Sequence, residues 1–149
     1  MSVPPPSPSM HFEASLVVKA PREKAYSAYT DFEAAPKWSK DKHAVRVSKR
    51  EGNKVYLDES PGTGGRKGAR EVQLFPPEEV ESESETRFTK TRSVVRFEEV
   101  PEGTKMTASL DVELKGRWSW IFKTQGKTQA ESSALEQLSS FARYVEALP

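Results

Sequence analysis

The fold is decided by residues 79–97, which read EVESESETRFTKTRSVVRF. From Glu79 to Phe88, charged residues alternate with apolar or small hydroxyl residues. This period of two is typical of a β-strand with one solvent-exposed face and one inward face. Residues 89–97 repeat the alternation, with lysine and arginine on the solvent-exposed face. Pairing the two segments as a hairpin sets glutamates across from basic residues, which stabilises one antiparallel register.

Further strands and helices surround this hairpin. Alternation predicts the other strands at 11–18, around 45–47, around 55–57, at 68–75 and at 106–114. A helix of about ten residues is expected from Pro21 to Asp31, and Pro36 is expected to end a short helix after it. A long C-terminal helix is predicted by an apolar stripe of Ala134, Leu135, Leu138, Phe141, Ala142 and Val145. Only this helix is large enough to cover the sheet.

Length and composition exclude several classes of protein. The 149 residues suit one domain with its own core, and a net charge of +1 removes any global electrostatic case for nucleic-acid binding. The absence of cysteine excludes disulfides and thiolate metal sites. No apolar run approaches the roughly 20 residues that span a bilayer. Residues 1–10 are Pro-rich and lack signal-peptide regions, so we expect a disordered tail, a single domain over 11–149 and a cytoplasmic location.

The segment after the first strand carries a family resemblance. It reads VKAPREKAY at 18–26, YTDF at 29–32 and PKW at 36–38. These residues resemble the opening of the START-like (SRPBCC) superfamily, nearest its polyketide cyclase/dehydrase and coenzyme-Q-binding group. The resemblance extends over 11–148. It implies an α+β helix-grip fold, in which a seven-stranded antiparallel curved sheet wraps around a long C-terminal helix. Sheet and helix leave between them a cavity for lipids, sterols, polyketides or quinones. The motif residues are structural, so the resemblance implies no particular chemistry.

The inward face of the 79–88 strand independently predicts a cavity. A strand that packs directly on a helix usually carries large apolar residues at its centre. Ser82, Ser84 and Thr86 stand there instead, and Ser93 continues the trend in the next strand. A ligand with an apolar body and a few polar groups would fill the space and satisfy the hydroxyls. The alternative is that this end of the sheet is exposed to solvent on both faces.

Arg70 is the candidate polar anchor of the cavity, because it shares a strand face with Val72. An inward guanidinium would bind a carboxylate or phenolate of a ligand. The alternative places Arg70 at the fraying end of its strand. Aromatic residues that are candidates for the cavity wall, or plain core in the alternative, are Tyr29, Trp38 and Tyr56.

The segment after Lys115 places Trp118, Trp120 and Phe122 among basic residues. This composition suits transient contact with a membrane surface. The alternative is that the segment plugs one end of the cavity, which would make Trp118 and Phe122 ligand contacts.

No pattern for metal, cofactor or nucleophilic chemistry is present. His11 and His43 lack metal-ligand spacing, and the Gly-rich loop at 61–68 lacks a phosphate-binding pattern. Three functions remain open. The leading one is a non-catalytic binder or carrier of a lipid, quinone or polyketide-like molecule. The others are a cyclase or dehydratase, with Arg70 and Tyr56 or the inward serines as its polar set, and a protein-interaction module without a ligand.

Overall fold

The computed structural model describes residues 9–39, 42–61, 68–85, 89–114 and 126–149. The strands are β1 (Ser9–Val18), β2 (Lys42–Glu51), β3 (Lys54–Pro61), β4 (Gly68–Phe75), β5 (Glu79–Glu85), β6 (Thr89–Val100) and β7 (Gly103–Leu114). The helical segments are α1 (Arg22–Thr30), the 3-10 helix η1 (Phe32–Lys37) and α2 (Gly126–Glu146).

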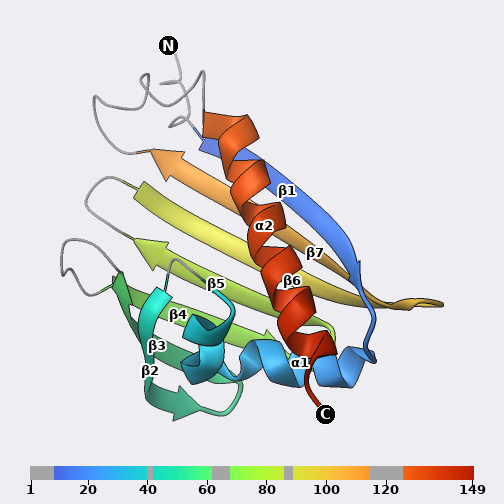
Figure 1. The fold of residues 1–149 in the computed structure, drawn as a ribbon. Helices are drawn as coiled ribbons and strands as arrows, with labels where there is room; N and C mark the ends of the chain where they lie inside the picture. Colours follow the sequence, from blue (N-terminus) through green and yellow to red (C-terminus); the bar gives the residue numbers. More distant parts are fainter. Residues whose placement is uncertain (1–8, 40–41, 62–67, 86–88, 115–125) are drawn as a thin grey trace.

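The strands form a single antiparallel sheet of seven strands in the order β1-β7-β6-β5-β4-β3-β2. Figure 1 shows the sheet curving around α2, with α1 and η1 at the end of the sheet where α2 terminates. This is the predicted helix-grip arrangement, and its order of one strand, two helices, six strands and a long helix is confirmed. Among the described residues, no helix is both long enough and apolar enough to cross a membrane.

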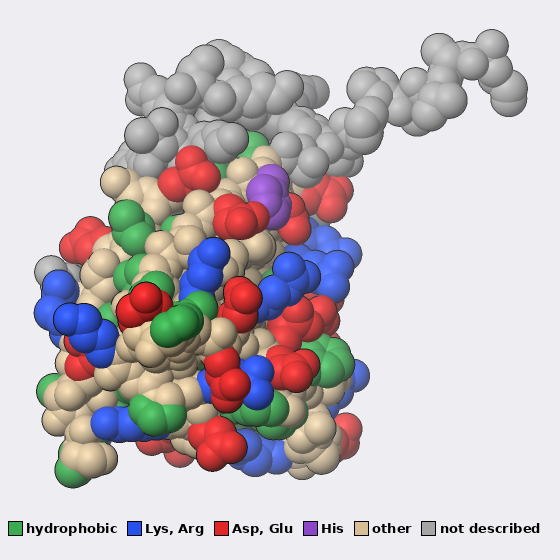
Figure 2. Space-filling model, turned by 90° about the vertical axis from the view of Figure 1, so that its right-hand side faces the viewer, with side chains coloured by type: hydrophobic (Ala, Val, Ile, Leu, Met, Phe, Trp, Pro, Cys, Tyr) green, Lys and Arg blue, Asp and Glu red, His purple; other side chains and the backbone are tan. Residues whose placement is uncertain are grey.

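The β5–β6 hairpin has the register that its charges predict. Glu79 pairs with Arg96, and Glu83 pairs with Arg92. The Nε of Arg96 lies 3.0 Å from an Oε of Glu79. Such exposed pairs each contribute less than about 1 kcal/mol, so they select the register more than they stabilise the fold. Figure 2 shows another face on which acidic and basic side chains are also interleaved.

The β6–β7 turn requires glycine. Gly103 has a φ of 145°, and a Cβ at this position would collide with the carbonyl oxygen of Val18. The neighbouring Thr104 is fully buried and donates a hydrogen bond of 2.8 Å from Oγ1 to the carbonyl oxygen of Ala20. The turn therefore fixes the connection between β1 and α1.

The helices match their predicted positions with two corrections. Leu135 lies at the edge of the apolar stripe of α2 and is 44% exposed, whereas Leu138, Phe141, Ala142 and Val145 are buried. Pro36 lies inside η1, which continues to Lys37. The prediction that Pro36 ends this helix is wrong, because a helix this short loses only one backbone hydrogen bond to a proline whose φ already suits it.

Candidate functional site

A small cavity lies between the concave face of β3, β4 and β5 and the side chains of α1 and η1. Its volume is about 30 Å³. A space of this size holds about one or two water molecules. The lining residues are Tyr29, Phe32, Ala35, Trp38, Val45, Leu57, Arg70, Val72, Val80 and Ser82.

Two of these lining residues belong to a polar cluster, which we define as Glu59, Arg70 and Ser82. The Nη1 of Arg70 donates a hydrogen bond of 3.1 Å to the Oγ of Ser82. The Nε of Arg70 lies 3.1 Å from an Oε of Glu59, and the two side chains are only 26% and 17% exposed. The alternation of the strands explains why these three side chains share one face of the sheet. Arg70 is in register with Leu57, which lies two residues before Glu59 on β3. Val72, two residues after Arg70 on β4, is in register with Ser82. A largely desolvated ion pair is thus held at the edge of an apolar cavity.

Glu59 is the member of this cluster that the sequence prediction missed. It follows Val55 and Leu57 at the period of two, and those residues are 0% and 2% exposed. Continuing the alternation by one step would have placed Glu59 on the inward face. The signal was lost because Glu59 adjoins the Gly-rich loop, where the strand was expected to have ended.

Aromatic rings close the other side of the cavity. Tyr29 and Trp38 stack with their ring centroids 5.9 Å apart, and both pack against Phe141 of α2. Burial raises the pKa of the Tyr29 hydroxyl, with the nearby charges of Arg70 and Glu59 acting in opposite directions. Tyr29 therefore stays protonated and can serve as a hydrogen-bond donor. The Nε1 of Trp38 is buried and has no hydrogen-bond partner in the described part of the chain.

The chemistry open to this arrangement is recognition of an oxygen atom. Arg70 can donate to a carbonyl, carboxylate or phenolate oxygen, and the apolar walls can contact a hydrocarbon body. The described residues that line the cavity include no histidine. Within the described ranges, no group of three or more His, Asp or Glu side chains could hold a metal ion.

A family model described as polyketide cyclase/dehydrase and lipid transport matches residues 18–130, which is more than half of the chain. The chain belongs to this family. Curated protein sequences provide no significant match.

Solved structures show how widely the fold of this family member is shared. A protein from Thermus thermophilus is 20% identical, with a TM-score of 0.76 over 94% of this chain and 98% of its own. The Zhui aromatase/cyclase of Streptomyces sp. R1128 is 11% identical, with a TM-score of 0.78 over 93% and 94% of the two chains. A norcoclaurine synthase of Thalictrum is 10% identical, with a TM-score of 0.71 over 94% and 96%. At these identities the likeness shows the fold alone.

The structure brings five of the predicted site residues of this family member to the cavity wall: Tyr29, Trp38, Arg70, Val72 and Ser82. Ser84 and Ser93 lie on the same sheet face, in register with Arg70 and Ser82, but they do not line the cavity. Thr86, Trp118, Trp120 and Phe122 lie outside the described residues. A role in ligand binding, or for Trp120 in membrane contact, remains a prediction for these residues.

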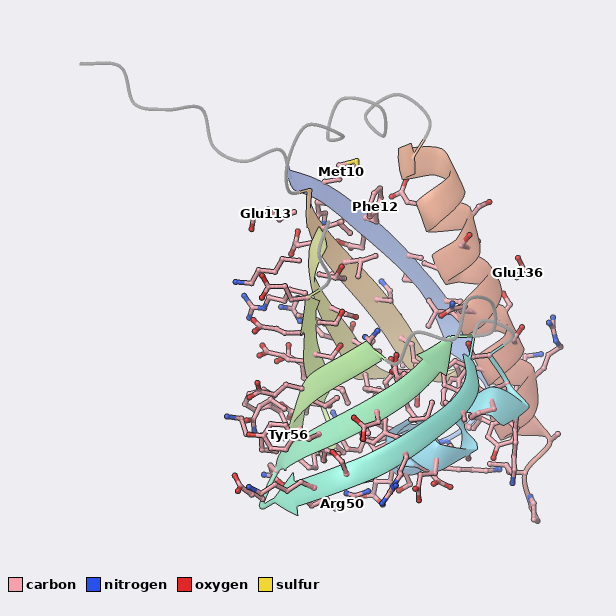
Figure 3. All side chains as sticks on the ribbon, turned by 90° about the vertical axis from the view of Figure 1, so that its left-hand side faces the viewer. Met10, Phe12, Arg50, Tyr56, Glu113 and Glu136 are labelled. Atoms are coloured by element: carbon pink, nitrogen blue, oxygen red, sulfur yellow. The ribbon has the colours of Figure 1, made fainter. Side chains whose placement is uncertain are left out.

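Tyr56 is misplaced in the prediction. Its strand neighbours Val55 and Leu57 are buried in the core, so the alternation of β3 directs Tyr56 to the opposite face of the sheet. It is in register there with Lys49 and Glu71. Figure 3 shows Tyr56 on the side of the sheet away from α2. Tyr56 therefore does not line the cavity and cannot form a polar pair with Arg70 inside it.

Proposed function

We propose that this protein binds an apolar small molecule, with Arg70 as the anchor for an oxygen atom of that ligand. The observation that carries the proposal is the polar cluster at the edge of an apolar cavity. Desolvating an ion pair is costly, and apolar residues of similar volume would usually be as stable. Stability alone therefore gives little reason for a half-buried arginine here, whereas ligand recognition does.

The hydrogen bonding of Arg70 supports this role. A guanidinium has five N–H donors in a fixed plane. In the described part of the chain, Ser82 engages Nη1 and Glu59 lies beside Nε, so Nη2 remains for a ligand oxygen. The two neighbours hold the plane of the guanidinium, which reduces the entropy lost when a ligand binds.

The size of the cavity sets a condition on binding. Drug-sized ligands occupy pockets of roughly 300–1,000 Å³, whereas this cavity measures about 30 Å³. A ligand of polyketide or lipid size must therefore select an expanded state of the protein. Delivery at a membrane surface through Trp118, Trp120 and Phe122, within the cytoplasm, remains part of the proposal.

Native mass spectrometry tests the proposal on the full chain, before and after extraction with organic solvent. We expect a co-purified apolar molecule that disappears on extraction and rebinds afterwards. Arg70→Met should rebind it at least about tenfold more weakly, because a charged hydrogen bond is lost. The matched control is Arg92→Met, which changes the same charge on the outer sheet face. Failure of the extracted protein to bind the co-purified molecule, a fluorescent lipid and a quinone would overturn the proposal.

Catalysis of the cyclase or dehydrase type is the second candidate, and Glu59 is the observation that favours it. A carboxylate beside Arg70 could accept a proton from a substrate that Arg70 polarises. The test incubates the extracted protein with a linear β-polyketone and follows loss of one water molecule by mass. Catalysis predicts a loss that depends on Glu59 and is abolished in Glu59→Gln. Binding without any change in mass would leave the carrier function.

A further inference from the structure

A second hollow lies on the outer surface, between the end of η1 and the last turns of α2. It is a groove of about 420 Å³, open to solvent, whose polar side chains are Lys37, Trp38, Ser39, Ser140, Arg143 and Tyr144. Two segments that are about a hundred positions apart in the sequence meet there. The volume of this groove is large enough for a ligand headgroup, unlike that of the inner cavity.

The charged residues among the described lining of the groove are both basic. Lys37 and Arg143 are its ionisable cations, and no aspartate or glutamate of the described residues lines it. The contact that Arg143 makes is a long hydrogen bond of 3.3 Å from Nη2 to the hydroxyl of Ser140. Arg92 and Arg96, by contrast, are paired with glutamates on the outer sheet face. The groove therefore presents two exposed cations that no carboxylate neutralises within the described structure.

A buried hydroxyl without a partner lines the same groove. Ser39 is only 2% exposed, and its Oγ makes no hydrogen bond in the described structure. Buried polar atoms are nearly always paired, so an orphaned hydroxyl in a groove that is lined by two cations indicates a missing acceptor. An oxyanion would accept from Ser39 and would neutralise Lys37 and Arg143.

Trp38 lies between this groove and the inner cavity, because it lines both spaces. We propose that the groove binds the anionic group, a carboxylate or phosphate, of an amphipathic ligand whose apolar chain passes Trp38 into the cavity. The position of the chain rests on the proposed function. The ligand class is then an oxygenated hydrocarbon chain that ends in an anion: the chain oxygen lies at Arg70, and the anion lies between Lys37 and Arg143.

Calorimetric titration tests this inference with three probes: decyl phosphate, decanol and inorganic phosphate. We expect decyl phosphate to bind at least about tenfold more tightly than decanol, because of charge-assisted hydrogen bonds, and to lose this advantage as salt is raised. Lys37→Gln/Arg143→Gln should abolish the preference. The control Arg50→Gln/Lys105→Gln removes the same charge from exposed positions outside the groove. This variant should keep the preference for decyl phosphate over decanol. Ser39→Ala should weaken decyl phosphate without lowering the melting temperature, because it deletes an unpaired hydroxyl.

The remaining outcomes separate this inference from the proposed function. Equal binding of decanol and decyl phosphate would overturn the inference and leave the binder function standing. The inference would also be overturned if the preference for decyl phosphate over decanol survived Lys37→Gln/Arg143→Gln but disappeared in Arg70→Met. The anion would then lie at Arg70. Inorganic phosphate binding as tightly as decyl phosphate would overturn the link between groove and cavity. Failure of both decyl probes to bind would count against both proposals.

Discussion

Two neighbouring parts of the interior are built from different residues. One is an aromatic cluster, defined as Tyr26, Tyr29, Phe97 and Phe141, whose rings meet edge to face with centroids 5.1 to 5.6 Å apart. The other is the polar cluster of β3, β4 and β5. Aromatic rings bury large apolar areas and gain further stability from edge-to-face contact, whereas a desolvated ion pair adds little net stability. The difference separates the part of the interior that holds the fold from the part that is free to recognise a ligand.

The strongest test of this contrast is Phe141→Ala. Phe141 is fully buried and contacts both Tyr29 and Trp38. The loss of a buried phenyl ring should lower the free energy of unfolding by about 3–5 kcal/mol. Urea denaturation measures the change. The control Leu135→Ala, at an exposed position on the same helix, should cost less than about 1 kcal/mol. Similar losses from both variants would mean that the aromatic cluster is not the stabilising part.

Arg70→Met should have a smaller effect on stability, because it removes the guanidinium from beside the largely desolvated carboxylate of Glu59. We expect a loss of about 1–3 kcal/mol in the free energy of unfolding. The double variant Glu59→Leu/Arg70→Met should recover most of this loss, because an apolar pair replaces the charges. Ligand binding should stay weak in both variants. A double variant no more stable than Arg70→Met would show that burial of the Glu59 carboxylate is not the source of this loss.

Ser82→Ala sharpens the comparison further. It removes the acceptor of the 3.1 Å hydrogen bond from Arg70 but keeps the ion pair with Glu59. The free energy of unfolding should change by less than about 1 kcal/mol. Rebinding of the co-purified molecule, measured by native mass spectrometry, should still weaken, because the guanidinium loses one of its two supports. A large loss of stability with unchanged binding would show that the polar cluster stabilises the fold and does not position Arg70 for a ligand.

The smallest effect is expected at His11, on the exposed surface outside both clusters. Hydrogen bonds to Asp111 and Glu13 raise the pKa of His11 in the folded protein above its ordinary value of 6.5. Its contribution to stability is therefore complete below pH 6.5 and is lost as the pH rises through the higher folded pKa. His11→Gln should flatten the pH dependence of urea unfolding in this window. An unchanged slope would show that the pair with Asp111 contributes nothing in solution.

The sequence predicted the sheet well because alternation is a local property. The residues around Glu79 and Arg96 specify both the two faces of the hairpin and its register, and the structure has that register. The same local rule, applied consistently, would have excluded Tyr56 and included Glu59. Both errors arose because each residue was judged by its chemical type and not by the face of the strand on which it lies. Leu135 was harder to place, because a position at the edge of a helical stripe is buried only if a neighbouring element reaches it.

Local patterns in the sequence were enough to predict the order of the elements and the inward face of most strands, and they made Arg70 a candidate for an inward arginine. Each of these follows from the geometry of a few consecutive residues. Only the tertiary structure decided the volume of the cavity, the pairing of Arg70 with Glu59 and Ser82, and the meeting of Lys37 with Arg143. Those features depend on distances between segments far apart in the chain, and such distances are set by how α2 and η1 pack on the curved sheet.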